Sequence, residues 1–129
     1  MRDLLPGDTV TASFYRYTEM GGREPSCQIW AHWNDDPDDL YGFDGDAGGN
    51  EEFGTGGEWD LTEWSWFVPY GTGHTGLVIE VRLFSEPGDT IWIDYMTIEA
   101  PAHSVVALPG DDPTPATETT WGEIKALFQ

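Results

Sequence analysis

Thr90-Ile-Trp-Ile-Asp-Tyr-Met-Thr-Ile98 is the stretch of sequence that best predicts the fold of this protein. It is rich in β-branched and aromatic residues, and successive side chains of a β-strand point to opposite faces. On this alternation one face carries Ile91, Ile93 and Tyr95, and the other carries Trp92, Asp94 and Met96. The turn residues Glu86-Pro-Gly-Asp89 come just before the stretch, so we expect a meander that ends in a hairpin-like return.

Four further runs have the same character and are separated by Gly, Pro and Asp. They are Asp8 to Tyr17, Cys27 to Trp33, Thr62 to Val68 and Leu77 to Phe84. With Thr90 to Glu99 they predict an all-β protein, an antiparallel β-sandwich over residues 1–100. A chain of 129 residues is long enough for one such core.

After Ala100 the sequence changes to Pro, Thr, Ala and Asp, which predicts an extended arm over residues 101–129. The arm ends in a predicted short helix, because Thr120-Trp-Gly-Glu123 matches a capping box. Its apolar face consists of Trp121, Ile124, Leu127 and Phe128. Isolated helices need roughly 12–15 residues to be stable, so this one is expected to dock on its own domain or on a neighbour.

The segment from Asn34 to Asp60 contains ten acidic residues and no Lys or Arg, and its length predicts a solvated acidic loop. Its aromatic residues are compatible with a short hairpin inside it. Closely spaced carboxylates also raise the hypothesis of a calcium site. The order of the residues disfavours an EF-hand loop, because Pro37 interrupts Asn34-Asp-Asp-Pro-Asp-Asp39 and the twelfth position is not Glu.

Composition excludes several classes of partner. Five Lys and Arg against 24 Asp and Glu give a net charge of −19, which repels nucleic acid and anionic lipid. No apolar run approaches the roughly 20 residues that cross a bilayer, and residues 1–20 lack the pattern of a signal peptide. The single Cys27 lies in an apolar alternation, which excludes an internal disulfide and predicts a buried thiol.

Seven Trp and five Tyr suggest sugar binding, because the apolar face of a pyranose packs on aromatic rings while acidic and amide groups accept bonds from its hydroxyls. Trp30 is the first choice as a platform, since the alternation turns it away from the apolar residues of its strand. The loop residues Tyr41, Trp59 and Tyr70 are further candidates. Trp64 and Trp66 share a face, and at least one of them is expected in the core.

Nothing in the sequence predicts catalysis or a required cofactor. His32, His74 and His103 lie in three different settings, without the spacing of a metal or nucleophile site. The acidic composition makes carboxylate pairs inevitable, and no pair is singled out as the acid and base of a glycosidase. The expectation is a protein that is not an enzyme.

Residues 5–99 resemble the carbohydrate-binding-module-like β-jelly-roll family, which occurs on secreted polysaccharide hydrolases and on phage tail and surface proteins. The resemblance lies in Pro6-Gly7 before an alternating strand, in Glu63-Trp64, and in Gly88-Asp-Thr-Ile-Trp-Ile-Asp94. It implies that Asp94 could help to hold a structural calcium. Modules of this family normally have two or more strands before the Pro-Gly strand. The arm at 101–129, a second copy of the chain or another virion protein would have to take that place.

The tail from Thr119 to Phe128 resembles a C-terminal segment of actinobacterial phage tail and surface proteins. Together the resemblances imply a phage virion accessory protein, on the head or the tail, that forms a dimer or trimer or binds other virion proteins. The first alternative is a carbohydrate-binding module for cell-wall or capsular glycan. The second is a calcium-dependent adhesin.

Overall fold

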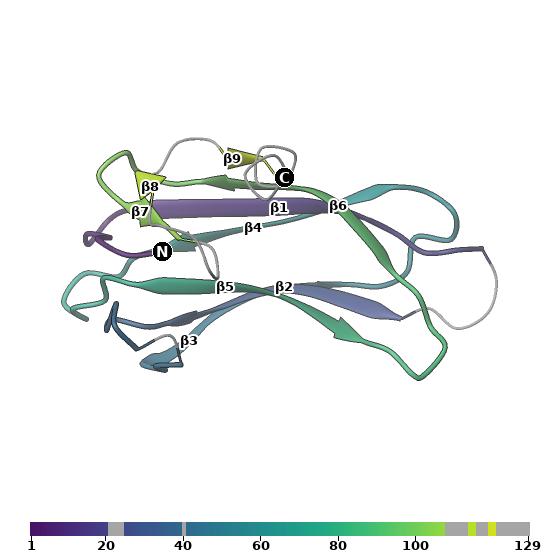
Figure 1. Ribbon diagram of the computed structural model, residues 1–129, viewed down its shortest axis with the longest axis horizontal. Helices are drawn as coiled ribbons and strands as arrows, with labels where there is room; N and C mark the ends of the chain where they lie inside the picture. Colours follow the sequence, from purple (N-terminus) through teal and green to yellow (C-terminus); the bar gives the residue numbers. More distant parts are fainter. Residues whose placement is uncertain (21–24, 40, 108–113, 116–118, 121–129) are drawn as a thin grey trace.

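The protein folds into two antiparallel sheets packed face to face (Figure 1). The computed structural model describes residues 1–20, 25–39, 41–107, 114–115 and 119–120. The first sheet, the β1 sheet, contains in order β4 (Asp60–Phe67), β1 (Thr9–Tyr17), β6 (Trp92–Glu99) and β9 (Thr119–Thr120). The second, the β2 sheet, contains β3 (Gly45–Glu52), β2 (Ser26–Trp33) and β5 (Leu77–Phe84), and β7 (Val105–Val106) pairs with β8 (Thr114–Pro115).

The predicted fold class is therefore confirmed: an all-β antiparallel sandwich. The five predicted strands correspond to β1, β2, β4, β5 and β6, with ends that differ by at most two residues. Nowhere in the described part of the chain is there a helix of the length and apolar character needed to cross a bilayer. The predicted docking helix, with Trp121, Ile124, Leu127 and Phe128, lies outside the described residues.

The predicted meander is wrong, because β5 and β6 belong to different sheets. The seven residues 85–91 between them are long enough to cross the roughly 10 Å that separates packed sheets. The crossing places β6 beside β1, where Ile98 is buried. Sequence periodicity describes one strand at a time, so it does not reveal which sheet a strand joins.

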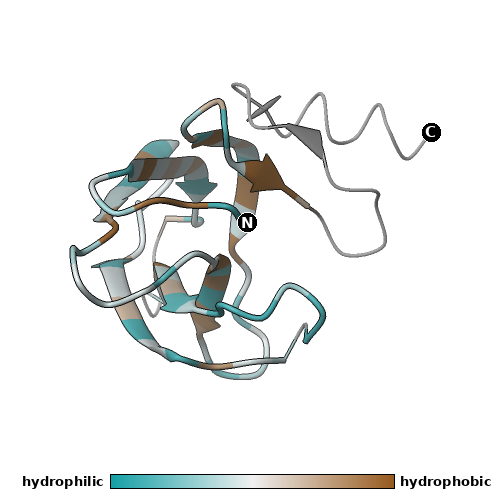
Figure 2. Ribbon diagram, turned by 90° about the vertical axis from the view of Figure 1, so that its left-hand side faces the viewer, coloured by the Kyte–Doolittle hydropathy of each residue, from teal (hydrophilic) through white to brown (hydrophobic). Residues whose placement is uncertain are grey.

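The core lies between the inward faces of the two sheets. Phe14 is its largest fully buried side chain, and Ile29 and Leu77 are equally inaccessible. The underlying alternation of apolar and polar residues is visible as brown and teal bands along the strands (Figure 2). Trp66 is buried, as expected for at least one of the Trp64 and Trp66 pair, while Trp64 is 40% exposed at the sheet edge.

The segment 34–60 is predicted as a solvated acidic loop, and this prediction is wrong for residues 45–52, which form strand β3. Its sequence, Gly-Asp-Ala-Gly-Gly-Asn-Glu-Glu, has poor strand propensity. Pairing with β2 along its whole length forms it nonetheless, and Trp66 Nε1 donates a 2.8 Å hydrogen bond to its Gly48 carbonyl. No other residue type fits at position 49, because a Cβ on Gly49 would collide with the carbonyl oxygen of Ile29. The short hairpin compatible with this segment is not formed within it, because β3 pairs with β2, which precedes the segment.

Chain segments at both ends of the sequence extend the sandwich. Met1 exchanges two backbone hydrogen bonds with Leu77 at the start of β5, and Leu4 is fully buried in the core. Strand β9, from the predicted arm, pairs with Thr97 and Ile98 on the outer edge of β6. The predicted arm therefore contributes a strand pairing to the sandwich.

The loop between β2 and β3 uses its acidic side chains to bind backbone N–H groups. Asp36 accepts from Asp38 N, Asp39 from Tyr41 N, and Asp44 from Asp35 N, at 2.8–3.0 Å. Short side chains that bond nearby backbone in this way stabilise turns. The abundance of Asp in this loop is thereby explained by local structure.

Asp35 joins this loop to the loop before β5. Its carboxylate accepts from Thr75 N at 2.8 Å and Gly76 N at 3.2 Å, and pairs with His74 Nδ1 at 2.8 Å. Burial raises the pKa of Asp35, but the bonds from Thr75, His74 and Gly76 outweigh burial and hold it below its usual value of 3.8. The carboxylate therefore stabilises the fold above that value, and this contribution is lost as the pH falls through the lowered folded pKa.

Asp35→Ala is expected to lower the free energy of unfolding at pH 7 by about 1–3 kcal/mol, because two backbone N–H groups lose a charged acceptor. The difference in unfolding free energy between the wild type and Asp35→Ala should become smaller below pH 3.8. Urea denaturation of both from pH 7 to pH 3 measures it. Asp38→Ala, an exposed carboxylate in the same loop, is the matched control. An equal loss in the control, or a gap that widens in acid, would contradict the assignment.

Candidate functional site

An open groove lies on the outer face of the β1 sheet, at the end where β1 finishes and β4 and β6 begin. Its volume is about 430 Å³, and it is lined by Tyr15, Trp59, Asp94 and Tyr95. Tyr15 comes from β1, Asp94 and Tyr95 come from β6, and Trp59 immediately precedes β4. Three chain segments that are distant in sequence therefore bring three aromatic rings and one carboxylate together.

A β-bulge in β6 places Tyr95 in the groove. Ser13 pairs with Thr97 and Tyr15 pairs with Asp94, so Phe14 alone lies opposite two residues of β6, Tyr95 and Met96. Tyr95 has a positive φ of 56°, which is costly for a bulky L-residue. The prediction that Tyr95 shares a face with Ile91 and Ile93 is therefore wrong. The extra residue reverses the alternation, so Tyr95 is 55% exposed while Met96 packs against the core.

The aromatic surface continues beyond the groove through Tyr17. Its ring centroid lies 5.4 Å from that of Trp59, in a tilted arrangement, and 5.6 Å from that of Trp92, edge to face. These are the spacings at which aromatic pairs attract one another. Trp92 and Trp59 remain 42% and 52% exposed, so their contacts with Tyr17 leave much of both rings accessible.

Asp94 is the polar group of the groove. It lies opposite Tyr15 in the β1–β6 ladder, and its Oδ1 accepts the N–H of Tyr95 at 2.8 Å. A calcium site at Asp94 stays a prediction without a ligand set: within the described residues, no three His, Cys, Asp or Glu side chains gather to hold a metal ion. The same holds for the acidic loop, where several carboxylates are bonded to backbone N–H groups.

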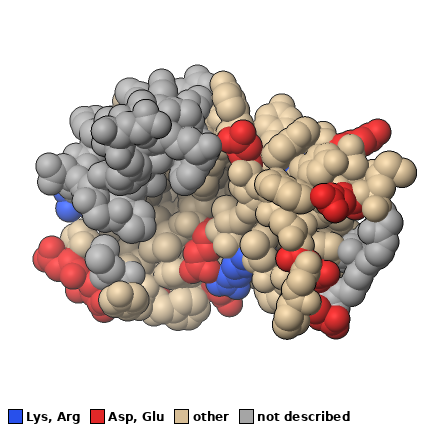
Figure 3. Space-filling view, turned by 45° about the vertical axis from the view of Figure 1, so that its right-hand side comes forward, with Lys and Arg blue, Asp and Glu red and all other residues tan. Residues whose placement is uncertain are grey.

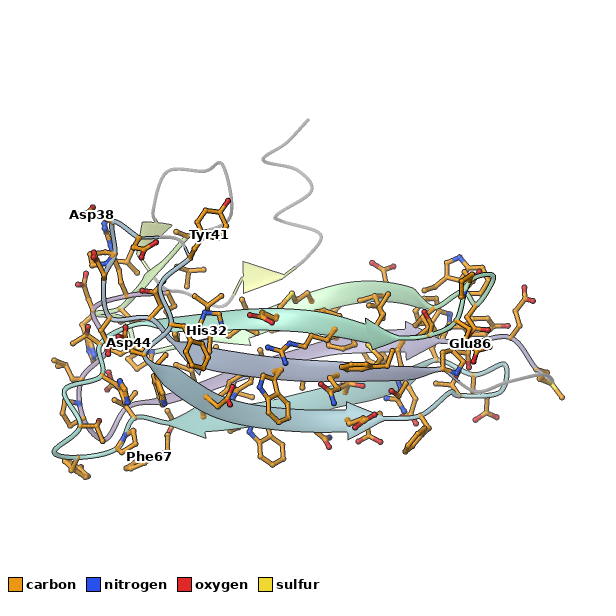
Figure 4. The ribbon with its side chains drawn as sticks, turned by 90° about the horizontal axis from the view of Figure 1, so that it is seen from below. His32, Asp38, Tyr41, Asp44, Phe67 and Glu86 are labelled. Carbon is orange, nitrogen blue, oxygen red and sulfur yellow. The ribbon has the colours of Figure 1, made fainter. Side chains whose placement is uncertain are left out.

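The four residues expected as sugar platforms do not converge, and only Trp59 lines the groove. Tyr41 is 94% exposed in the β2–β3 loop, close to Asp38 and Asp44 at one end of the sandwich (Figure 4). Tyr70 follows β4 and meets Phe67, with ring centroids 6.0 Å apart, at that same end. Trp59 precedes β4 and so lies at the other end, where Figure 4 also places Glu86.

Trp30, the first choice from the sequence, lies on the outer face of the β2 sheet as the alternation predicts. The Arg82 guanidinium carbon sits 5.7 Å from the centroid of its ring, so a cation already occupies that ring face. Arg82 is held there by Glu80, at 2.7 Å. The indole N–H of Trp30 is buried and has no hydrogen-bond partner. This arrangement makes Trp30 a weaker platform than Trp59.

Side chains that could carry catalysis are dispersed. His32 pairs with Glu80, His74 with Asp35, and His103 with Asp8, each through one contact of 2.7–2.9 Å. Burial raises the pKa of the Cys27 thiol to about 11, against a smaller opposing effect of Arg16. The predicted buried thiol is confirmed, and it is protonated at neutral pH.

Sequence reasoning missed Tyr15, Tyr17, Trp92 and Tyr95 as site residues. The outward direction of Tyr15 and Tyr17 could have been predicted, because they alternate with the apolar residues Val10, Ala12 and Phe14, which are buried. Trp92 follows from the same argument on β6. Tyr95 had no signal, since its exposure depends on the bulge.

Comparison with known proteins finds no family model that matches the chain, and no match among curated proteins or solved structures. The function of this protein must therefore be argued from the chemistry of the groove itself.

Proposed function

We propose that this protein is a non-enzymatic module that binds glycans in the groove formed by Tyr15, Trp59, Asp94 and Tyr95. The observation that carries the proposal is the convergence of three exposed aromatic rings and a carboxylate on the face of one sheet. The C–H groups of a sugar pack on aromatic rings, and a carboxylate accepts hydrogen bonds from its hydroxyls. This is the chemistry that the sequence led us to expect, built from mostly different residues.

The volume of the groove and the backbone strain at Tyr95 both support a binding role. Its volume of about 430 Å³ lies within the roughly 300–1,000 Å³ common for ligand sites. Tyr95 adopts a backbone conformation that costs about 1–3 kcal/mol, and strain of this kind gathers at functional sites. Solubility alone gives no reason to hold a tyrosine half exposed on a strained bulge.

A glycan array followed by calorimetry tests the proposal. We expect the protein to bind a defined glycan with a Kd between micromolar and millimolar, roughly 4–8 kcal/mol of binding free energy. Ligand-induced quenching of tryptophan fluorescence should accompany binding, because Trp59 lies in the groove. Absence of binding to every neutral, acidic and amino sugar on the array would rule the proposal out.

The edge of the sandwich formed by β5 favours a second candidate function. This is a virion accessory protein that assembles with copies of itself or with other virion proteins. Strand β5 ends the order of its sheet, and its Leu83 and Phe84 are each 50% exposed. Strand β9 pairs with β6, the last long strand of the facing sheet. Residues 121–129, with the predicted apolar helix face, follow directly in sequence. Apolar side chains on both the edge and the tail are suited to a protein partner.

Deletion of residues 119–129 is expected to weaken self-association, because it removes β9 and the apolar residues that follow it. The intact chain should form a dimer or trimer that is stronger at high salt, since added ions screen the repulsion between chains of charge −19. Analytical ultracentrifugation of both proteins at low and high salt measures this. An intact chain that stays monomeric at every concentration and ionic strength would contradict the prediction.

A further inference from the structure

The exposed aromatic surface at this end of the β1 sheet is larger than the groove. Its six aromatic or aliphatic side chains, here called the aromatic patch, are Tyr15, Tyr17, Trp59, Leu61, Trp92 and Tyr95. They lie in two rows that cross from the β4 side over β1 to β6. Tyr15 lies opposite Leu61 in the β1–β4 ladder, and Tyr17 lies opposite Trp92 in the β1–β6 ladder. The groove takes up only part of the patch, because Tyr17, Leu61 and Trp92 are not among its lining residues.

Ring and aliphatic surface, rather than charge, characterises the aromatic patch. All of its residues except Tyr17 are more than 40% exposed. None of the six has a carboxylate or a basic group, although the whole chain has a net charge of −19. Figure 3 likewise shows the charged groups on one side of the molecule scattered between wider areas of other residues. A ligand that covers the patch is therefore held mainly by packing on the rings.

The spacing and tilt of the rings indicate the shape of that ligand. The ring centroid of Tyr17 lies 5.4 Å from that of Trp59 and 5.6 Å from that of Trp92. The ring planes of these two pairs differ by 40° and 65°, so the three rings do not form one flat surface. A single rigid sugar ring can therefore pack on only one of the two indoles at a time. A chain of sugar rings joined by rotatable bonds can place a separate ring on each.

We propose that the site binds oligosaccharides of two or more linked sugars, with Trp92 as a second platform beside the groove. This inference rests on the proposed glycan function and names its ligand class. One sugar ring packs on Trp59 in the groove, and a linked ring packs on Trp92. Tyr17 lies between the two indoles and contacts both through its ring. A single sugar reaches only one platform, so affinity depends on the length of the chain.

Calorimetry with sugars of three lengths tests the inference. The probes are the mono-, di- and tetrasaccharide of β-1,4-linked N-acetylglucosamine and, where the array identifies a different glycan, the same three lengths of that glycan. A site for one sugar would gain at most about fourfold between the mono- and tetrasaccharide, because any of four sugars could occupy it. We expect a gain of roughly tenfold or more, because the longer chain packs on two indoles.

Trp92→Ala removes the second platform and leaves the residues that line the groove in place. It should weaken binding of the tetrasaccharide roughly fivefold or more and leave binding of the monosaccharide within about twofold of the wild-type value. The gain between the mono- and tetrasaccharide should then fall to about fourfold or less. This change in length dependence separates a platform from a residue that only supports its neighbours, whose loss would weaken both sugars equally.

Trp64→Ala is the matched control. Trp64 belongs to the same sheet and is 40% exposed, close to the 42% of Trp92. It lies opposite the buried Ala12 in the β1–β4 ladder, so it belongs to the inward face and not to the aromatic patch. Its substitution should change neither affinity. Far-ultraviolet circular dichroism verifies that both variants are folded.

Each outcome decides a separate point. A wild-type gain of about fourfold or less, or an equal loss of both sugars in Trp92→Ala, would overturn this inference and leave the glycan function intact. Equal loss of the tetrasaccharide in Trp92→Ala and Trp64→Ala would also overturn it. If no glycan of any length bound, the proposed function would fall, and this inference with it.

Discussion

Phe14→Ala is expected to destabilise the protein by about 3–5 kcal/mol, the largest effect of any change considered. Phe14 is fully buried at the centre of β1, the strand that pairs with both β4 and β6. Its removal leaves a cavity under the bulge that holds Tyr95. Domains are stable by about 5–15 kcal/mol, so a loss of about 3–5 kcal/mol would be at least about a fifth of the total. Urea denaturation, with the midpoint and slope fitted separately, measures it.

The neighbouring residue provides the control. Tyr15→Ala changes a side chain of similar size on the same strand, but Tyr15 faces outward and is 41% exposed. We expect it to cost about 1 kcal/mol or less in stability. Because Tyr15 lines the groove, the same substitution should weaken glycan binding. Equal destabilisation by the two substitutions would show that the faces of β1 have been assigned wrongly.

The second large effect concerns the ligand. Trp59→Ala is expected to weaken glycan binding by about 2 kcal/mol or more, roughly thirtyfold, because a packed aromatic ring is a typical dominant contact in an interface. Trp59 is 52% exposed, so its removal should leave the far-ultraviolet circular dichroism spectrum unchanged. Calorimetry with the best glycan from the array measures the loss of affinity.

Trp30→Ala discriminates between the two candidate surfaces. From sequence alone, Trp30 is the preferred platform and its loss should abolish binding. In the folded protein Arg82 stacks on its ring, on the sheet opposite the groove. We therefore expect Trp30→Ala to leave affinity within about twofold of the wild-type value, less than 0.5 kcal/mol. Loss of binding in Trp30→Ala with retention in Trp59→Ala would transfer the site to the β2 sheet.

The strands of this protein could be predicted because each is a local pattern. In β5, Leu77 through Phe84 lies where the alternation of apolar residues placed it. In β2, Cys27, Ile29 and Ala31 are buried as expected. Side-chain alternation is a property of the extended backbone itself, so it survives whatever the strand packs against.

Strand β3 shows where local patterns end. Gly45 to Glu52 has the composition of a turn, and its backbone is ordered by β2 on one side and by the indole N–H of Trp66 from the facing sheet. Such a strand is specified by partners distant in sequence. Local strand propensity therefore fails to predict β3, because the contacts that form this strand come from residues distant in sequence.

The candidate site, too, could be predicted from the sequence only in part. Its chemical character can be anticipated from the sequence, because aromatic residues in an acidic chain indicate sugar binding. Trp59 is a candidate platform there, and Asp94 is singled out only by the resemblance, as a residue that could help to hold calcium. Their meeting could not be anticipated, because Trp59 and Asp94 are 35 positions apart and meet only once β4 and β6 take places on either side of β1.

The sequence by itself determined the all-β class, the places of five strands, the acidity of the surface and the burial of Cys27, because each depends on composition or on period-two alternation. The tertiary structure alone decided the sheet to which β6 belongs, the existence of β3, and the outward turn of Tyr95. The sheet of β6 and the existence of β3 depend on long-range strand pairing, and the outward turn of Tyr95 depends on the extra residue that β6 has opposite the stretch between Ser13 and Tyr15. A shift of one residue reverses the face of every side chain that follows it, and only the partner strand determines where that shift occurs.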